Sequence, residues 1–343
     1  MLDGPHSPGT AAQAVFPGHG RGPALDEAPG SCVLGLDVGG TGMKGAVFDR
    51  DMRPLESVRR PTPRGDGPEA VVDAVADTLL VLSGAATRRG LRVRHAGVVV
   101  PGIVDDARER AVRSANIGWR DLPLAGLLEA RTGLRVTLGH DVRAGGLAEG
   151  ALGAARGARD VLFVAIGTGV AAAIVSDGRP VQAGGYAGEL GHVVVESPGR
   201  RCACGGSGCL ETVASAAAVA EAYGARSGRA VTGAADVAEL TERGDPVAGA
   251  VWRRATEGLA DALATATTLL GPELIVLGGG LAEAGRLLLD PVRAGLDERL
   301  GFQRRPTLLR AELGDRAGCL GAGLTAWRAA DAMTAVRTGA AAP

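Results

Sequence analysis

The sequence predicts an α/β protein in which two domains face each other across a cleft. The chain has 343 residues, which is more than one hydrophobic core usually supports and enough for two domains. Hydrophobic patterns typical of strands alternate along it with patterns typical of helices. A strand, a turn of glycine and threonine and a second strand occur twice, near the start of each expected domain. This repetition indicates an internal duplication around a shared cleft.

Composition and charge restrict the class of ligand. The formal net charge is -1, which argues against a protein that binds nucleic acid by neutralising its phosphates and favours a small neutral or anionic ligand. Residues 1–30 contain several prolines and glycines and no sustained apolar run, so we expect a disordered tail and neither a signal peptide nor a membrane span. Five cysteines, three of them crowded together, favour metal binding in a reducing compartment over a disulfide framework. We therefore expect a cytoplasmic location.

A β-hairpin opens the ordered chain. The segment CVLGLDVGG predicts a buried strand, and TGMKGAVFD predicts a second strand after a glycine turn. The turn has the pattern D-x-G-G-T, in which small residues let backbone N–H groups approach a phosphate and a threonine hydroxyl can bond it; its residues are Asp37, Gly39, Gly40 and Thr41. A plain hairpin turn accounts for the same residues. No helix follows the turn, which argues against a nicotinamide-dependent dehydrogenase.

A strand, a helix and a further strand follow the hairpin. LESVRR predicts a third strand, residues 68–89 carry Val, Ala and Leu at helical spacing, and HAGVVVPGIVDD predicts a buried strand that enters a tight turn. The next segment, SANIGWRDLPL, predicts a loop that carries Asn116. A loop asparagine often caps a turn, but its amide can also bind a sugar hydroxyl. Asn116 is therefore a candidate binding residue with a structural alternative.

Asp141 lies where a strand gives way to a helix. The preceding GLRVTL predicts a short strand, and the following RAGGLAEGALGAA predicts a helix of small residues. Aspartate at such a junction commonly caps the first helical turn. The same junction can also project a carboxylate into the cleft, where it can act as a general base. The phosphate-type turns on either side favour the second role for Asp141.

The second half of the chain repeats the pattern of the first. DVLFVAIGTGVAAAIV predicts a strand, a phosphate-type turn and a strand, with the turn at Gly167, Thr168 and Gly169. Residues 247–270 predict a long helix. ELIVLGGGLAEAG predicts a buried strand with a turn that either approaches a base or a phosphate or simply joins strand to helix; the turn comprises Gly278, Gly279 and Gly280. PTLLRAEL predicts a late strand, and CLGAGLTAWRAA predicts the final helix.

The segment AGELGHVVVESPGRRCACGGSGCLE predicts a metal site. One imidazole and three thiols form the donor set that closes a tetrahedral structural zinc site: His192, Cys202, Cys204 and Cys209. Free buried cysteines are the alternative, but three cysteines within eight positions and interleaved with glycines favour Zn²⁺. Two carboxylates, Glu189 and Glu211, bracket the segment. They are helix-end or surface groups, or the zinc loop holds them rigidly enough to accept hydrogen bonds from hydroxyls.

Together these motifs resemble those of the ROK family of sugar kinases, within the actin-like ATPase superfamily. The resemblance covers roughly residues 31–330. LGLDVGGTGMKGAVFD is similar to the first phosphate motif of the family, AIGTGVAAAIV to the second and LIVLGGGLAEAG to the adenosine-side motif. GELGH and CACGGSGCLE are similar to its zinc and sugar-binding signature, the most specific of these motifs. The resemblance implies an actin-like ATPase (ribonuclease H-like) fold with an interdomain cleft and a structural zinc site.

The resemblance also assigns roles to residues. It implies ATP-dependent phosphorylation of a primary hydroxyl of a hexose or sugar-like substrate, with Asp141 as the catalytic base. The implied sugar-binding residues are Asn116, His140, Glu189, His192 and Glu211. The implied residues of the ATP and phosphate site are Asp37, Gly39, Gly40, Thr41, Lys44, Gly167, Thr168, Gly169, Gly278, Gly279 and Gly280. The implied cofactors are ATP, Mg²⁺ and structural Zn²⁺, the zinc being held by His192 and the three cysteines.

We expect the chain to divide into two domains between two tails. The N-terminal domain covers residues 31–141 and is completed by the helix near 317–330, and the C-terminal domain covers residues 142–316. Residues 331–343 are expected to fray. A small-molecule sugar is the expected partner, without nucleic acid or membrane, and the family suggests a homodimer or homotetramer. The donor, ATP or polyphosphate, stays open.

One residue departs from the family pattern. Kinases of the family usually have Asn-Asp where this chain has His140 and Asp141. Histidine cannot match both faces of an amide, so the acceptor is a hexose such as glucose or, alternatively, an N-acetylated hexosamine or a sugar-like cyclitol. A sugar-responsive transcriptional regulator is the alternative class. Such members carry an added winged helix-turn-helix, for which residues 1–30 leave no room.

Overall fold

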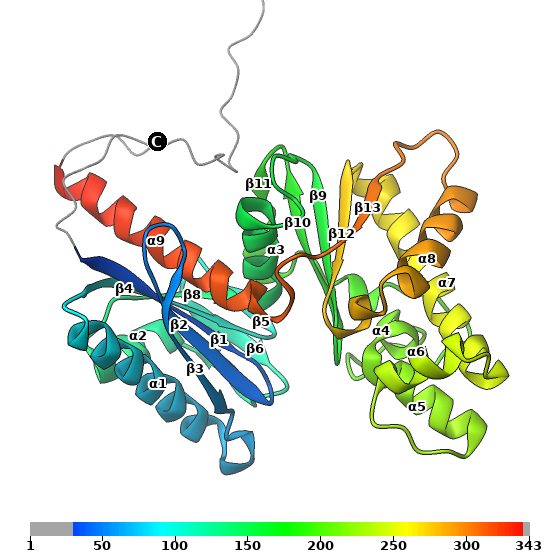
Figure 1. Cartoon of the computed structure of the whole chain (residues 1–343), viewed down its shortest axis with the longest axis horizontal. Coiled ribbons are helices and arrows are strands. Elements are labelled where there is room, and N and C mark those ends of the chain that lie inside the picture. Colours follow the sequence, from blue (N-terminus) through cyan, green and yellow to red (C-terminus); the bar gives the residue numbers. More distant parts are fainter. Residues whose placement is uncertain (1–29, 339–343) are drawn as a thin grey trace, which may run out of the picture.

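A computed structural model describes residues 30–338 of the chain. Two five-stranded sheets lie beside each other with helices around them (Figure 1). The tail expected over residues 1–30 lies outside the described residues except for Gly30, and so do residues 339–343 of the expected frayed end. The predicted α/β class is confirmed.

The first sheet has the strand order β3-β2-β1-β4-β8. Its strands are β1 (Ser31–Val38), β2 (Gly42–Phe48), β3 (Pro54–Pro61), β4 (Arg92–Val100) and β8 (Val136–His140). β1, β2 and β3 pair antiparallel, whereas β4 and β8 run parallel to β1. The predicted hairpin is confirmed. Because β1 and β8 point the same way, Asp37 near the end of β1 and Asp141 after β8 lie at the same edge of the sheet.

Helices cover both faces of the first sheet. α1 (Pro68–Arg88) and α2 (Leu124–Thr132) pack on one face, and α9 (Ala317–Thr338) packs on the other. Leu34 and Leu36 of β1 lie in the core with α1, whereas Val33 lies in the core with α9. Among the helices that the structure describes, α1 alone has the length and apolar composition of a membrane span. Its apolar side is buried against the sheet, which is how a core helix packs.

A small antiparallel sheet follows β4. It consists of β5 (Ile103–Asp105), β6 (Arg110–Ser114) and β7 (Trp119–Leu122). Trp119 anchors it, because the ring is buried and its indole N–H donates to the carbonyl oxygen of Pro68 at 3.0 Å. The segment predicted as a loop is therefore a hairpin, and Asn116 lies in the turn between β6 and β7.

The second sheet repeats the strand order of the first. Its order is β11-β10-β9-β12-β13, formed by β9 (Val161–Ile166), β10 (Val170–Ser176), β11 (Arg179–Pro180), β12 (Leu274–Gly278) and β13 (Thr307–Arg310). β9, β10 and β11 pair antiparallel, and β12 and β13 run parallel to β9. The internal duplication that the sequence predicts is confirmed at the level of topology.

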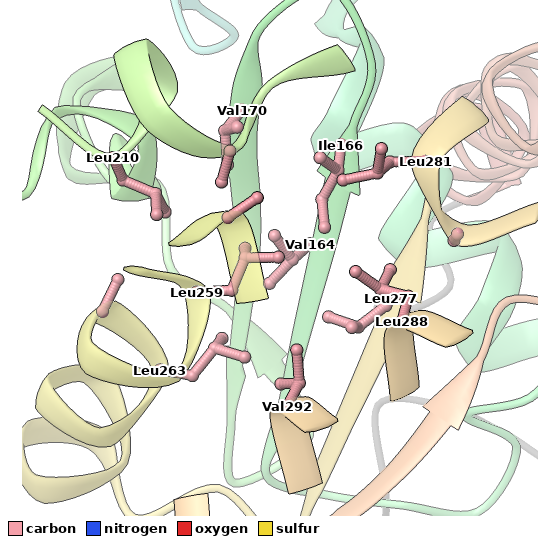
Figure 2. Close-up of a cluster of buried hydrophobic side chains, with 14 of the residues drawn as sticks. Val164, Ile166, Val170, Leu210, Leu259, Leu263, Leu277, Leu281, Leu288 and Val292 are labelled. Atoms are coloured by element: carbon pink, nitrogen blue, oxygen red, sulfur yellow. The ribbon is translucent and has the colours of Figure 1, made fainter. Parts of the chain in front are cut away.

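The largest core lies between the second sheet and its helices (Figure 2). The helices are α4 (Glu211–Ala214), α5 (Ala216–Ser227), α6 (Ala234–Glu242), α7 (Pro246–Leu270) and α8 (Arg286–Arg299). Val164 of β9 faces Leu259 of α7, and Leu277 of β12 lies beside Leu288 of α8. The long helix predicted over residues 247–270 is confirmed. It begins where the carboxylate of Asp245 accepts two backbone N–H groups and ends at a left-handed glycine, as such caps require.

Helix α3 (Asp141–Leu152) connects the two halves of the molecule. Its glycines Gly145 and Gly146 pack on Phe163 and Ala173 of the second sheet. The last turn of α3 is bonded to the segment that follows β13 of the second sheet. There the fully buried carboxylate of Glu149 accepts N–H groups from Ala154, Glu312 and Leu313. The start of α3 therefore belongs to the edge of the first sheet and its body to the second.

Helix α9 approaches its neighbours at backbone distance. A Cβ on Gly321 would overlap the carbonyl oxygen of Ala144 in α3, and a Cβ on Gly97 in β4 would overlap the carbonyl oxygen of Ala322. α9 also continues to Thr338, so the expectation that the chain frays from residue 331 is wrong over residues 331–338. This part of the helix is held to the first sheet, where Arg94 Nη2 of β4 donates to Thr334 Oγ1 at 2.8 Å. The packing of α9 on the first sheet supports the proposed N-terminal domain, 31–141 completed by this helix.

Candidate active site

Asp141 is the first residue of α3, directly after β8. The residue that caps the helix is His140, whose Nδ1 accepts the backbone N–H of Arg143 at 3.3 Å. The alternative in which Asp141 itself caps the helix is therefore wrong. The Asp141 carboxylate accepts the N–H of Val142 at 2.7 Å, and its side chain is 26% exposed. The structure thus leaves this carboxylate partly open at the end of the first sheet.

His140 lies against Asp141 and is nearly buried. Its Nε2 is 3.4 Å from Asp141 Oδ1. Burial lowers the pKa of His140, while the charges of Asp141 and Glu189 oppose this shift. The neutral ring, whose Nδ1 accepts a backbone N–H, carries its proton on Nε2 and directs it toward Asp141. His140 therefore lies against Asp141, and the charge of Glu189 also acts on it.

Asp37 forms a second carboxylate at the same edge. Burial raises the pKa of Asp37 to about 7, and the charge of Asp141 contributes to this shift, while Lys44 opposes it. The first turn of α9 covers the carboxylate, because a Cβ on Gly318 would lie 2.6 Å from Asp37 Oδ2. Two carboxylates that repel each other's charge offer the oxygen ligands that Mg²⁺ prefers. The donor set fits a divalent cation.

The first glycine turn lies beside Asn116. The N–H of Gly39 donates to the carbonyl oxygen of Gly42 at 2.9 Å, and Thr62 Oγ1 donates to the carbonyl oxygen of Gly39 at 2.6 Å. A Cβ on Gly40 would lie 3.6 Å from the Cβ of Asn116. The glycine turn and the Asn116 hairpin are far apart in the sequence but lie side by side in the structure. A phosphate bound at the turn and a sugar bound at Asn116 would therefore be close together.

Lys44 lies on β2 and is held by a residue that the sequence analysis missed. Its Nζ donates to the carbonyl oxygen of Asp315 at 3.1 Å and lies 3.5 Å from that residue's Oδ2. Arg59 of β3 binds the same carboxylate at 2.8 Å and lowers the pKa of Asp315. The structure therefore places the Lys44 ammonium at Asp315, near the start of α9, where its charge still acts on Asp37.

Glu211 supports the second glycine turn. Its Oε2 accepts the N–H of Val170 at 2.9 Å and would lie 2.5 Å from a Cβ on Gly169. Gly191, two residues after Glu189, packs on the backbone of Val170, where a Cβ would overlap the carbonyl oxygen. Glu211 is therefore bonded to the start of β10, and the backbone that follows Glu189 packs on the same strand.

The third glycine turn adjoins the second. Gly279 has a φ of +82°, and its Cβ would lie 2.5 Å from the carbonyl oxygen of Ile166 at the end of β9. Only glycine fits this position. A Cβ on Gly280 would meet no atom within 4 Å, so the turn also leaves open space beside it. Close approach of a nucleotide to these two turns is compatible with this geometry.

Four side chains after β10 fit a zinc ion. The ligand atoms of His192, Cys202, Cys204 and Cys209 all lie within 4.8 Å of one another. Cys204 Sγ is 3.7 Å from Cys209 Sγ, and His192 Nδ1 is 3.7 Å from Cys202 Sγ. Tetrahedral coordination with Zn–S bonds of about 2.3 Å requires sulfur atoms about 3.8 Å apart. The spacing and the donor set both fit Zn²⁺.

The zinc cluster reaches the other candidate residues through His192. While Nδ1 faces the thiols, Nε2 lies 3.6 Å from Glu189 Oε2. This is the arrangement in which a carboxylate orients a metal-binding imidazole. Burial raises the pKa of Cys209 to about 12, so this thiol remains protonated unless a cation is bound, whereas the backbone N–H of Gly206 lowers the pKa of Cys204.

Arg143, Asp106 and Gln182 also belong to this region, and the sequence analysis missed them. Arg143 Nη2 donates to Asp106 Oδ1 at 2.8 Å, and Gln182 Nε2 donates to Asp106 Oδ2 at 3.0 Å. The three residues come from separate segments and share no motif. Arg143 lies in the first turn of the helix that begins at Asp141, and this position is the one sign in the sequence that it belongs to the site.

Comparisons with known proteins show which family the chain is similar to. A model of the ROK family matches residues 33–328. A glucokinase of Streptomyces coelicolor is 32% identical over 312 residues, which cover 84% of this chain and 96% of that protein. The crystal structure of a ROK hexokinase from Thermus thermophilus has a TM-score of 0.77 and 34% identity, covering 88% of this chain and 99% of that one. A ROK family glucokinase from Streptomyces griseus, solved in complex with glucose and AMPPNP, has a TM-score of 0.75 and 31% identity, covering 87% and 99%.

Proposed function

Because the chain belongs to the ROK family, we propose that it is an ATP-dependent sugar kinase that phosphorylates a primary hydroxyl of a hexose or sugar-like acceptor. The observation that carries this function is the placement of Asp141. It stands at the start of α3, partly open, with the carboxylate of Asp37 at the same sheet edge and His140 against it. A carboxylate in this position suits a general base better than a structural cap.

Asp141 accepts the proton of the acceptor hydroxyl as its oxygen attacks the γ-phosphoryl group of ATP. Backbone N–H groups of the first and second glycine turns bind the phosphates, with Thr41 and Thr168 as hydroxyl donors. Mg²⁺, when bound, neutralises charge on the phosphate oxygens. Asp37 would hold that ion, and the charge of Asp141 at the same sheet edge would add to the attraction.

The acceptor binds on the side of Asp141 that faces the zinc segment. Asn116 presents its amide from the tip of the β6–β7 hairpin, and His140 presents Nε2. The remaining hydroxyl partners are Glu189, His192 and Glu211. His192 and the three cysteines would hold Zn²⁺ in a structural role. The bound ion would fix His192, and through it Glu189, so that the geometry of both is preorganised.

His140 makes the choice of acceptor a separate question. The polar groups around a hydroxyl discriminate strongly between sugars, because an unmatched buried partner is costly. The acceptor is accordingly a hexose such as glucose, or alternatively an N-acetylated hexosamine or a cyclitol. The same proposal includes a cytoplasmic location and an assembly of two or four copies. It also includes closure of the two domains over the sugar, which excludes water.

A panel of acceptors tests the proposal. The acceptors are glucose, mannose, N-acetylated hexosamines, allose and cyclitols. ADP release is measured with ATP as donor, and formation of the sugar phosphate is measured with polyphosphate as donor. We expect turnover with at least one sugar and a product phosphorylated at its primary hydroxyl. ADP release that is the same with and without every acceptor contradicts a kinase.

Asp141→Asn is the matched variant for this assay. The amide keeps the size of the side chain but cannot take the proton, so kcat should fall by about 100-fold or more. ATP binding and thermal stability should stay near those of the parent, which separates loss of the base from loss of the fold. Activity within a few-fold of the parent would remove Asp141 from the role of base.

A further inference from the structure

Arg143 carries a buried charge two residues after the proposed base. Its side chain is 8% exposed, although guanidinium groups stay charged. It lies in the first turn of α3, where its backbone N–H donates to the ring of His140. A charge in this position is costly unless it is paired and hydrogen-bonded. The groups around the guanidinium therefore indicate what Arg143 holds in place.

The guanidinium binds two segments that are far apart in the sequence. Nη2 donates to the carbonyl oxygen of Val104 at 2.9 Å and to Asp106 Oδ1 at 2.8 Å. Nη1 donates to the carbonyl oxygen of Gly185 at 3.4 Å. Val104 belongs to β5, 39 residues before Arg143, and Gly185 lies 42 residues after it. Arg143 thereby joins the small sheet to the segment 182–185.

The two segments also contact each other directly. Gln182 Nε2 donates to Asp106 Oδ2, so the Asp106 carboxylate is bound from both sides. A Cβ on Gly185 would overlap the carbonyl oxygen of Val104, so the backbones meet with no side chain between them. Ala183 has a φ of 47°, a left-handed conformation that strains a residue other than glycine. Contacts to Asp106 and Arg143 offset this strain and keep segment 182–185 in its tight turn.

Segment 182–185 leads directly to the acceptor side of the site. Gly188 packs against β10, because its carbonyl oxygen accepts the N–H of Ala172 at 2.7 Å. Glu189 is the next residue in the chain. Arg143 is thus two residues from Asp141 along α3 and bonded to a residue four positions before Glu189. The guanidinium therefore links the helix turn that carries Asp141 to the segment that precedes Glu189.

We propose that Arg143 is a positioning residue of the kinase reaction: it fixes segment 182–185 against β5 and thereby sets the distance between Asp141 and Glu189. This inference rests on the proposed kinase function. Its effect falls on the acceptor, because the three glycine turns lie outside these contacts. A displacement of about 1 Å at reacting groups can cost about 100-fold in rate.

Arg143→Ala and Arg143→Lys test the proposal by steady-state kinetics. In Arg143→Ala we expect kcat/KM for the acceptor to fall about 10- to 100-fold through both a raised KM and a lowered kcat, with the KM for ATP within about twofold of the parent. Lysine offers a point charge in place of a planar fork, so it should restore only part of the loss. Guanidinium ion at a low, non-denaturing concentration should raise the activity of Arg143→Ala, because it can occupy the vacated position.

Arg299→Ala is the control. Arg299 also binds a carboxylate and a backbone carbonyl oxygen, those of Asp261 and Gly295, but it does so between α7 and α8. Its removal should leave the acceptor KM unchanged, and guanidinium ion should not raise its activity. The double variant Arg143→Met/Asp106→Asn leaves no unpaired charge and keeps the test valid if Arg143→Ala alone folds poorly; its acceptor KM should rise as well.

Hydrogen exchange provides a readout that does not depend on turnover. Amides of residues 182–189 should exchange faster in Arg143→Ala than in the parent or in Arg299→Ala. Unchanged exchange there, or a loss of activity that guanidinium ion does not reverse and that tracks thermal stability alone, would overturn the proposal. A parent that phosphorylates no acceptor contradicts the kinase function, whereas an active parent with an unchanged Arg143→Ala acceptor KM contradicts only the positioning role.

Discussion

His140 serves the helix and the site with its two ring nitrogens. Nδ1 caps α3, and Nε2 faces Asp141. The sequence marks His140 as a departure from the family pattern but does not indicate the cap, because histidine is not among the residues that usually cap helices. Short motifs predict Asp141, Glu189 and the glycine turns as candidate site residues, because such motifs consist of residues that are neighbours in the sequence.

His140→Asn tests the role of the ring in acceptor choice. Asparagine is also a good cap, so stability should be retained, while kcat/KM for glucose relative to the other sugars of the panel should rise by about 10- to 100-fold. The KM for ATP should change little. The measurement compares kcat/KM for two or more sugars in both proteins; equal scaling for all sugars would mean that His140 supports Asp141 without contacting the acceptor.

Asp37 predicts a pH dependence of stability. The unfolded carboxyl ionises near 3.8 and the folded one at about 7, so between these values the folded state retains a proton that the unfolded state has released. Stability due to this group is therefore lost as the pH rises from about 4 to 7. Asp37→Asn removes the ionisation, and we expect its Tm to exceed that of the parent by roughly 5 °C at pH 8 and to match it below pH 4.

Two controls accompany the Asp37 measurement. Asp66→Asn changes an exposed carboxylate and should shift Tm equally little at both pH values. Mg²⁺ should raise the Tm of the parent at pH 8 more than that of Asp37→Asn, since a ligand of the folded state stabilises it. A Tm difference between Asp37→Asn and the parent that does not change with pH contradicts the raised pKa.

At the scale of elements, the helices and strands that depend on neighbouring residues are predictable from the sequence, and those that depend on distant contacts are not. The hairpins β1–β2 and β9–β10 and the helix α7 were predicted because alternation, glycine turns and caps are local signals. The segment 114–124 is predicted as a loop but contains β7, because this strand is short and depends on the burial of Trp119 under α1. The contacts of Arg143 join residues about 40 positions apart, and no local pattern encodes them.

The zinc segment predicts a metal-dependent element. The parent should contain one Zn²⁺ per chain, and Cys204→Ser should lose most of it together with thermal stability, because metal binding is coupled to the folding of its ligands. Cys32→Ala is the control: this cysteine is buried in β1, away from the cluster, and its loss should leave the zinc content unchanged. Metal analysis checks both; full zinc in Cys204→Ser contradicts the site.

At the scale of the whole molecule, α9 holds the two halves through glycines. We expect Gly321→Ala to lower the free energy of unfolding by about 1–3 kcal/mol, because the methyl group would push α9 away from Ala144 in α3. Gly126→Ala in α2 is the opposite case: a Cβ there meets no atom within 4 Å, and alanine favours the helix by about 0.5–1 kcal/mol. Chemical denaturation measures both, and changes of the same sign would contradict this packing.

The position of α9 also bears on how the protein is synthesised. The first sheet is made early, yet one of its faces is covered by a helix that starts about 280 residues after the end of β1. At ~5–20 residues per second, translation separates the two by roughly 15–55 s. During that interval Val33, Ala46 and Phe48 have no native partner from α9, so the nascent chain depends on a chaperone or on transient contacts to shield them. The N-terminal half is thus the first to be translated and among the last to be completed.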